Sequence, residues 1–138
     1  MSSTINTKRA LPGALLLILG GVVQALQGVA ALSTGGYFTA PRGYDFGFSI
    51  GAWGFVHLVI GVLAIAVGIG VLSANPLARL LGLALAAASL LANFLWLPIE
   101  PLWSIVLIAL ATLALWSLAT SGPSLMAKRG DDPTESAH

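Results

Sequence analysis

The sequence predicts an all-α fold, a bundle of four transmembrane helices that run up, down, up and down. The 138-residue chain is 57% hydrophobic and only 8% charged, against about 25% charged residues in a typical soluble domain. Its charged residues are separated by four long uncharged blocks, each long enough for one crossing by the ~20 residues that a helix needs to span a bilayer. The blocks do not alternate between polar and apolar residues, which favours helices over the strands of a barrel.

Proline and asparagine residues indicate where the helices begin and end. Pro12 suits a first helical turn, because its missing N–H is not needed there. The apolar run around it is longer than the ~7–15 residues of a signal-peptide core, so we expect a helix and not a cleaved leader. Asn75-Pro76 stops the second helix, and Pro98 and Pro101 bracket the turn before the fourth. These signals predict helices over about residues 12–32, 49–72, 77–97 and 102–118.

The helices form one predicted domain, residues 11–120. A short N-terminal tail, residues 1–10, precedes it, and a polar tail, residues 121–138, follows it and is expected to be disordered. A polar, glycine-rich and aromatic loop, residues 33–48, separates the first two helices.

The positive charges predict the orientation, because Lys and Arg collect in short cytoplasmic loops and tails. With both termini cytoplasmic, only Arg42 lies outside, whereas five basic residues lie inside: Lys8, Arg9, Arg79, Lys128 and Arg129. Arg79 is expected to extend to the inner head groups. We therefore expect a multi-pass protein of the inner (plasma) membrane.

The composition excludes several classes of function. With no cysteine, the chain has no disulfide framework, CxxC redox pair, thiolate metal site or covalent haem attachment. It contains no phosphate loop, GxSxG elbow or HExxH zinc motif. A net charge of +1 provides no basic face for nucleic acid. We therefore expect no enzyme activity, no metal and no cofactor.

Glycines predict where the helices pack closely. Gly54, Gly61 and Gly68 recur every seven residues on nearly one face of the second helix, and Gly82 belongs to a stripe of small and polar residues on the third. Small residues let helices approach each other, and such packing drives association in lipid. We expect these four glycines at contacts between helices.

Four polar side chains are expected at similar depth in the outer half of the bundle, given a rise of ~1.5 Å per residue. They are Gln24, Gln27, His57 and Asn93, with Arg42 and Glu100 in the loops above them. One hypothesis is that they only join helices by hydrogen bonds. A second is an outward-opening pocket for a lipid head group, a quinone ring or a small solute. Proton or ion handling is a third, which the lack of a carboxylate inside any helix disfavours.

Glu100 has two readings of its own. The first, which we favour, is an anchor that keeps the turn hydrated at the membrane interface. The second is a partner of Arg42 or His57.

Four short motifs follow one another within residues 12–119. They are Trp53-Gly54-x-x-His57-Leu58-x-x-Gly61, Ala78-Arg79 with Gly82, Ala92-Asn93-Phe94-Leu95-x-Leu97-Pro98, and Pro101-x-Trp103-Ser104. Together they resemble a family of short actinobacterial membrane proteins that is known only as a domain of unknown function. The resemblance implies a four-span bundle and an actinobacterial source, and it implies no activity.

The chain departs from that family at two places. Members typically carry an aromatic residue before the second proline of the turn, where this chain has Glu100. The last helix of members often carries an acidic residue after Ala-Leu, where this chain has Ala109-Leu110-Ala111. No role that depends on that carboxylate is expected here.

These observations together predict a small non-catalytic membrane protein. We expect an accessory, packing or assembly subunit of a larger membrane complex, or a small homo-oligomer. Its partners would be the bilayer and another membrane protein or a second copy. The alternative is a lipid- or quinone-binding carrier that uses the outer polar pocket.

Overall fold

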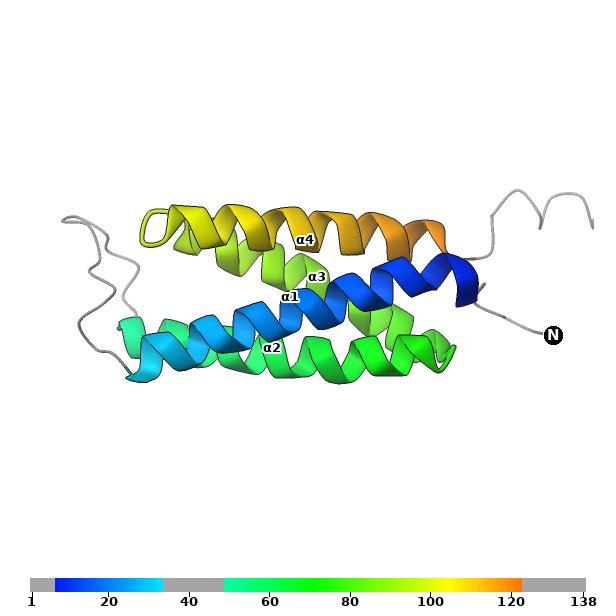
Figure 1. Cartoon of the computed structure of the whole chain (residues 1–138), viewed down its shortest axis with the longest axis horizontal. Coiled ribbons are helices and arrows are strands. Elements are labelled where there is room, and N and C mark those ends of the chain that lie inside the picture. Colours follow the sequence, from blue (N-terminus) through cyan, green and yellow to red (C-terminus); the bar gives the residue numbers. More distant parts are fainter. Residues whose placement is uncertain (1–6, 34–48, 123–138) are drawn as a thin grey trace, which may run out of the picture.

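The computed structural model describes residues 7–33 and 49–122 and consists there of four helices (Figure 1). They are α1 (Thr7–Ser33), α2 (Ile50–Leu72), α3 (Pro76–Trp96) and α4 (Pro101–Thr120). All four are long and apolar enough to cross a membrane. The all-α class and the four expected helices are therefore confirmed. The expected loop at Arg42 and, apart from residues 121 and 122, the C-terminal tail that was expected to be disordered lie outside the described residues.

The first helix begins earlier than its sequence signal indicated. α1 starts at Thr7, five residues before the expected start at Pro12, and Pro12 lies inside it. The proline provides no N–H to the carbonyl of Lys8, one turn before it. Hydropathy marks the part of a helix that fits inside lipid, and a helix can continue beyond that part into the polar interface. The other boundaries differ from expectation by at most two residues, and the end of α2 at Leu72 is as expected.

Side chains and a tight turn set the boundaries of α2 and α3. The hydroxyl of Ser49 caps α2 by accepting from the N–H of Ala52 at 3.2 Å. Asn75 caps α3 by accepting from the N–H of Leu77 at 2.9 Å. Between these helices Ala74 has a φ of 57°, and the N–H of Asn75 donates to the carbonyl of Gly70 at 3.3 Å. This is a Schellman turn with alanine at the left-handed position where glycine is usual.

Successive helices run in opposite directions, so the start of α1 and the end of α4 lie at the same end of the bundle (Figure 1). Each helix packs on two neighbours, in the order α1, α2, α3, α4 and back to α1. The diagonal pair α1 and α3 is in contact only over a short stretch. The α3–α4 turn, residues 97–100, marks the opposite end of the bundle, which is called the turn end below.

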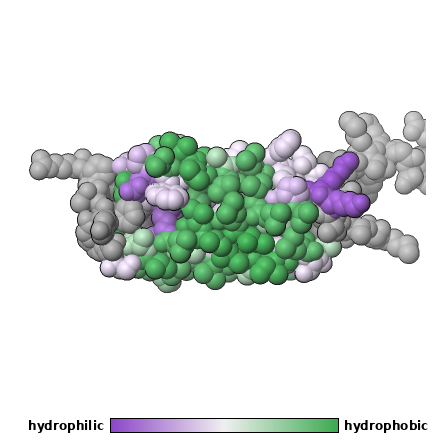
Figure 2. Space-filling view, viewed as in Figure 1, coloured by the Kyte–Doolittle hydropathy of each residue, from purple (hydrophilic) through white to green (hydrophobic). Residues whose placement is uncertain are grey.

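Small residues fill the interior and large apolar residues cover the outside. Among the described residues, nine of the fifteen buried hydrophobic residues are alanines, whereas Leu102 is 71% exposed and Trp116 is 69% exposed. Figure 2 shows a wide apolar surface across the middle of one face, with polar atoms toward its two ends. Large apolar side chains outside and small ones inside suit a bundle surrounded by lipid, where close packing holds helices together.

Apart from Trp53, the buried residues of α2 follow a seven-residue repeat, and so do those of α4 together with its C-cap Ser121. Their spacing alternates between three and four residues, through Gly54, His57, Gly61, Ala64, Gly68 and Val71 on α2, and through Ser104, Leu107, Ala111, Ala114 and Leu118 on α4 to Ser121 just after it. A repeat of this kind keeps one seam of the helix toward its partners along its whole length.

The closest approach in the bundle is a glycine seam between α1 and α2. A Cβ atom added at Gly61 would lie 2.5 Å from the backbone nitrogen of Ala25 and 2.6 Å from the carbonyl oxygen of Gly21. One added at Gly28 would lie 2.5 Å from the nitrogen of Leu58 and 2.6 Å from the carbonyl oxygen of Gly54. Along this seam backbone touches backbone.

The other two glycines that the sequence singled out also lie buried at helix contacts. A Cβ at Gly68 would lie 2.6 Å from Cγ1 of Ile18 on α1. At Gly82 on α3, it would lie 2.9 Å from Leu17 of α1 and 3.0 Å from Leu118 of α4. These nearest neighbours are side chains, although the carbonyl oxygen of Ala14 also lies 3.1 Å from a Cβ at Gly68, so this packing is less rigid than that at Gly61.

Candidate functional site

Most buried polar side chains of the described residues gather in the half of the bundle near the turn end. Each helix contributes, and each side chain is at most 9% exposed. We call this set the polar cluster: Gln24 and Gln27 of α1, His57 of α2, Ser89 and Asn93 of α3, and Ser104 of α4. Burying so many polar groups in a helix bundle is costly unless they find partners. The partners of each therefore decide what this region can do.

One part of the polar cluster is a hydrogen-bonded bridge between α1 and α3. The hydroxyl of Ser89 donates to Oε1 of Gln24 at 2.5 Å. The side-chain amide of Asn93 donates to the carbonyl of Ser89 at 2.8 Å and approaches its hydroxyl at 3.4 Å. The bridge joins the two diagonal helices, which otherwise barely meet. Gln24 and Ser89 therefore link the two helices, and Asn93 supports Ser89 from one turn further along α3.

His57 lies apart from this bridge, between aromatic rings. It is fully buried, and its ring meets Trp96 edge-on with centroids 5.3 Å apart and Trp53 with centroids 6.5 Å apart. Neither ring nitrogen has a hydrogen-bond partner among the described residues. A pairing of His57 with Glu100, one of the roles considered for that carboxylate, is therefore not formed. Arg42, the other residue considered, lies outside the described residues.

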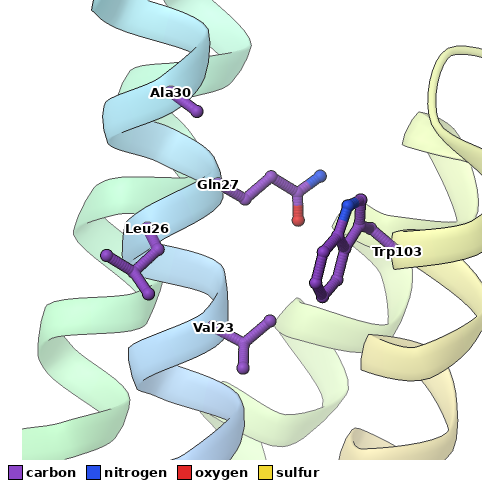
Figure 3. A pocket seen from close by; sticks show the side chains of 5 residues that line it. All are labelled: Val23, Leu26, Gln27, Ala30 and Trp103. Atoms are coloured by element: carbon purple, nitrogen blue, oxygen red, sulfur yellow. The ribbon is translucent and has the colours of Figure 1, made fainter.

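Gln27 faces a groove between α1 and α4 at the turn end (Figure 3). The groove has a volume of about 290 Å³ and is lined by Val23, Leu26, Gln27, Ala30 and Trp103. Figure 3 shows the amide of Gln27 pointing across the groove toward the indole ring of Trp103. The Gln27 side chain is only 8% exposed, and neither its nitrogen nor its oxygen has a partner among the described residues. We call this feature the α1–α4 groove.

A second, much smaller cavity lies at the centre of the bundle. Its volume is about 20 Å³, and its polar border consists of Gln24 and Ser89. Nε2 of Gln24 has no hydrogen-bond partner among the described residues. A cavity of this size holds a single water molecule, which could accept from that nitrogen.

The structure thus divides the four polar residues that the sequence placed at one depth. Gln24 and Asn93 meet through Ser89, His57 is enclosed by tryptophans, and Gln27 alone faces the larger groove. Glu100 lies at the start of α4, where its side chain forms no cap. No group of three potential metal ligands occurs within residues 7–33 and 49–122.

Sequence reasoning missed three members of this region as site residues. Ser89 belongs to the stripe of small and polar residues on the third helix, and Trp103 and Ser104 occur in the motif Pro101-x-Trp103-Ser104, but neither pattern predicts a site role for them. The signal for Ser104 was its place directly after Trp103, three residues before the buried Leu107. For Trp103, the sequence carries no signal that separates it from other interfacial tryptophans.

The family comparison covers nearly the same part of the chain as the helices. The model of a domain of unknown function, DUF7144, matches residues 10–123. No curated protein and no solved structure shows significant similarity to the chain. The resemblance to a family of unknown function is thereby confirmed, while the actinobacterial source stays a prediction. The match spans well over half of the chain, from the first turn of α1 to just beyond the end of α4, and the chain therefore belongs to the DUF7144 family.

Proposed function

We propose that the protein binds a small apolar molecule that carries a hydrogen-bonding oxygen, taken from the lipid into the α1–α4 groove. The observation that supports this proposal is the state of Gln27. Its amide is more than nine-tenths buried, points into the groove, and has no partner among the described residues for either of its polar atoms.

The energetics of Gln27 favour an occupied groove. A buried polar group without a hydrogen bond costs about 1–3 kcal/mol, and buried polar groups in proteins are nearly always paired with protein atoms or with bound molecules. The amide offers two N–H donors and one carbonyl acceptor. A ligand oxygen near this amide would accept from one of its N–H groups, and a hydroxyl there would also donate to its carbonyl oxygen.

The rest of the groove suits the apolar part of such a ligand. Val23, Leu26 and Ala30 form its apolar lining, and Trp103 adds an aromatic wall with an indole N–H. Most ligand sites combine an apolar lining with a few placed polar groups. The surface near the groove is apolar, with Leu26 64% exposed and Leu102 71% exposed. Entry would therefore occur sideways from the lipid.

The proposed orientation has both termini in the cytoplasm and the protein in the inner membrane. The basic residues within the described part of the chain support it, because Lys8, Arg9 and Arg79 all lie at the end opposite the turn end. The groove then opens in the outer half of the bilayer. A cytoplasm-active reporter fused after His138 should be active, and one inserted after Gly43 should be inactive. The reverse pattern would overturn the orientation.

Retained molecules test the function directly. The protein would be purified in mild detergent from its native host, and the preparation divided between protein and small-molecule mass spectrometry. We expect a stoichiometric small molecule with the natural chain and its loss with Gln27→Leu. Gln24→Leu removes a matched amide that does not line the groove, so this variant should keep the molecule. His57→Leu should keep it as well.

The other outcome identifies the accessory-subunit function that the sequence favours. A stoichiometric protein partner, with no small molecule retained by any of these variants, would contradict the binding proposal. It would also name the complex in which the protein serves.

A further inference from the structure

We infer that the occupant of the α1–α4 groove is a neutral, planar, carbonyl-bearing head group of the quinone class on an apolar tail, and not a phospholipid head group. This inference rests on the proposed function and specifies the chemistry of its ligand. Three features of the groove support it: the charge of its lining, the kind of hydrogen bonds it offers, and its size.

Among the described residues, the lining of the groove carries no charge. The described residues that line it are Val23, Leu26, Gln27, Ala30 and Trp103. A phosphate group in an apolar site requires Arg, Lys or several converging N–H groups. Arg79 is positively charged but lies at the end of the bundle opposite the groove. There its guanidinium donates to the carbonyls of Leu118 and Ala119 at 2.8 and 3.2 Å. A neutral head group therefore matches the groove, and an anionic one does not.

The polar groups of the groove match a carbonyl oxygen. Gln27 extends its amide toward the indole of Trp103, so N–H donors are present on both walls. A carbonyl between the walls can accept from the amide. The oxygen of the same amide can accept from a hydroxyl, so the reduced form of such a head group would also be held. Trp103 provides a flat aromatic surface, on which a ring packs in an offset or edge-to-face arrangement.

The size of the groove sets the part of the ligand that it encloses. At about 290 Å³ it lies at the lower limit of the range of about 300–1,000 Å³ for ligand pockets. It thus holds a head group of one or two rings and leaves no room for a long tail. The tail would lie outside, along α1, where Leu19 is 53% exposed and continues the face of Val23 one turn further.

Tryptophan fluorescence tests the class of ligand. Decylubiquinone, a benzoquinone with a ten-carbon chain, would be titrated into the full-length protein in detergent micelles. Quinones quench nearby indoles, so the natural chain should show saturable quenching. Trp103→Phe should lose most of the saturable part, and Trp116→Phe, which removes a tryptophan at the opposite end, should keep it. Gln27→Leu should weaken binding about tenfold, as expected for a buried hydrogen bond, and Gln24→Leu should leave it unchanged.

A groove-filling variant keeps the test independent of the amide. Ala30→Phe places a ring in the groove without removing a polar group, and it should abolish saturable quenching while circular dichroism shows the same helix content. If Gln27→Leu fails to fold, this variant alone decides the outcome.

The remaining outcomes distinguish failure of the quinone proposal from failure of the proposed binding function. Quenching that is linear and identical in the natural chain and in Ala30→Phe would overturn the quinone class. If phosphatidylglycerol is then retained by the natural chain and lost by Gln27→Leu, the binding function stands and its ligand is a lipid. If neither decylubiquinone nor phosphatidylglycerol responds to any groove variant, both proposals fall.

Discussion

Replacing Gly61 by alanine should force α1 and α2 apart. The added Cβ would lie 2.5 Å from the nitrogen and 2.9 Å from the Cα of Ala25, and 2.6 Å from the carbonyl oxygen of Gly21, where 3.4–4 Å is an ordinary contact. All three atoms belong to the backbone of α1, so no side-chain rotation can relieve the overlap. The two helices must therefore separate by roughly 1 Å along this part of the seam, given the spacing at which dispersion contacts are favourable.

The magnitude follows from the contacts that such a separation weakens. A gap of 0.5–1 Å loses about a quarter to a half of the dispersion energy of each contact. No hydrophobic effect between helices compensates for the loss in lipid. Overpacked sites typically lose about 1–3 kcal/mol, and since the obstacle is backbone we expect Gly61→Ala to lose about 2 kcal/mol of unfolding free energy. Gly61→Leu should lose more.

Reversible unfolding by SDS in mixed micelles, followed by circular dichroism, measures this difference. Gly20→Ala is the matched control, because a Cβ at Gly20 meets its nearest heavy atom, Cβ of Leu110, at 3.8 Å. The control should keep or slightly raise stability, since alanine has the higher helix propensity. Equal unfolding midpoints for Gly61→Ala and Gly20→Ala would refute the argument that backbone contact holds α1 against α2.

Three further predictions concern other parts of the bundle. Arg79→Met removes two hydrogen bonds to the last-turn carbonyls of α4 and should cost about 1 kcal/mol in the same SDS assay, whereas Arg9→Met, at an exposed position, should cost nothing measurable. Ser89→Ala and Gln24→Leu, combined in a double-mutant cycle, should show a coupling of about 0.6–1.7 kcal/mol, and a coupling of zero would contradict the bridge between α1 and α3. Ala74→Gly should raise the thermal midpoint in detergent by relieving the left-handed backbone at that position, a gain of up to about 1 kcal/mol, and a lowered midpoint would show that the turn adopts another conformation.

The helices were predictable because lipid leaves the backbone few choices. An uncharged apolar block of sufficient length has to pair its own N–H and C=O groups, and a helix does so within the segment. The seven-residue spacing of Gly54, Gly61 and Gly68 likewise pointed to one packed face. The start of α1 at Thr7 was not predictable from hydropathy, because Lys8 and Arg9 lie beyond the apolar block and are still helical.

That the polar residues share one half of the bundle was predictable, but the directions of their side chains were not. Gln24 and Gln27 are three residues apart, which turns their side chains by about 60° around the helix. That rotation is enough to point Gln24 at Ser89 of α3 and Gln27 into the groove beside α4. Which neighbour lies on which side depends on the order of the helices around the bundle, and no spacing within one helix contains that information. Trp103 was overlooked for the same reason.

Large apolar residues cover the outside of this bundle and small residues fill its inside, so its stability depends on lipid as the surrounding solvent. In water, folding is driven by buried apolar area, and an interior of alanines such as Ala64, Ala86 and Ala114 offers little of it. Replacing the outer leucines by charged residues would therefore not yield a stable soluble bundle. Such a redesign would also need larger interior side chains, and the α1–α2 seam has no space for them. Chains that contact lipid in this way can exchange outer leucines, isoleucines and valines freely during evolution, whereas each seam glycine has no acceptable substitute.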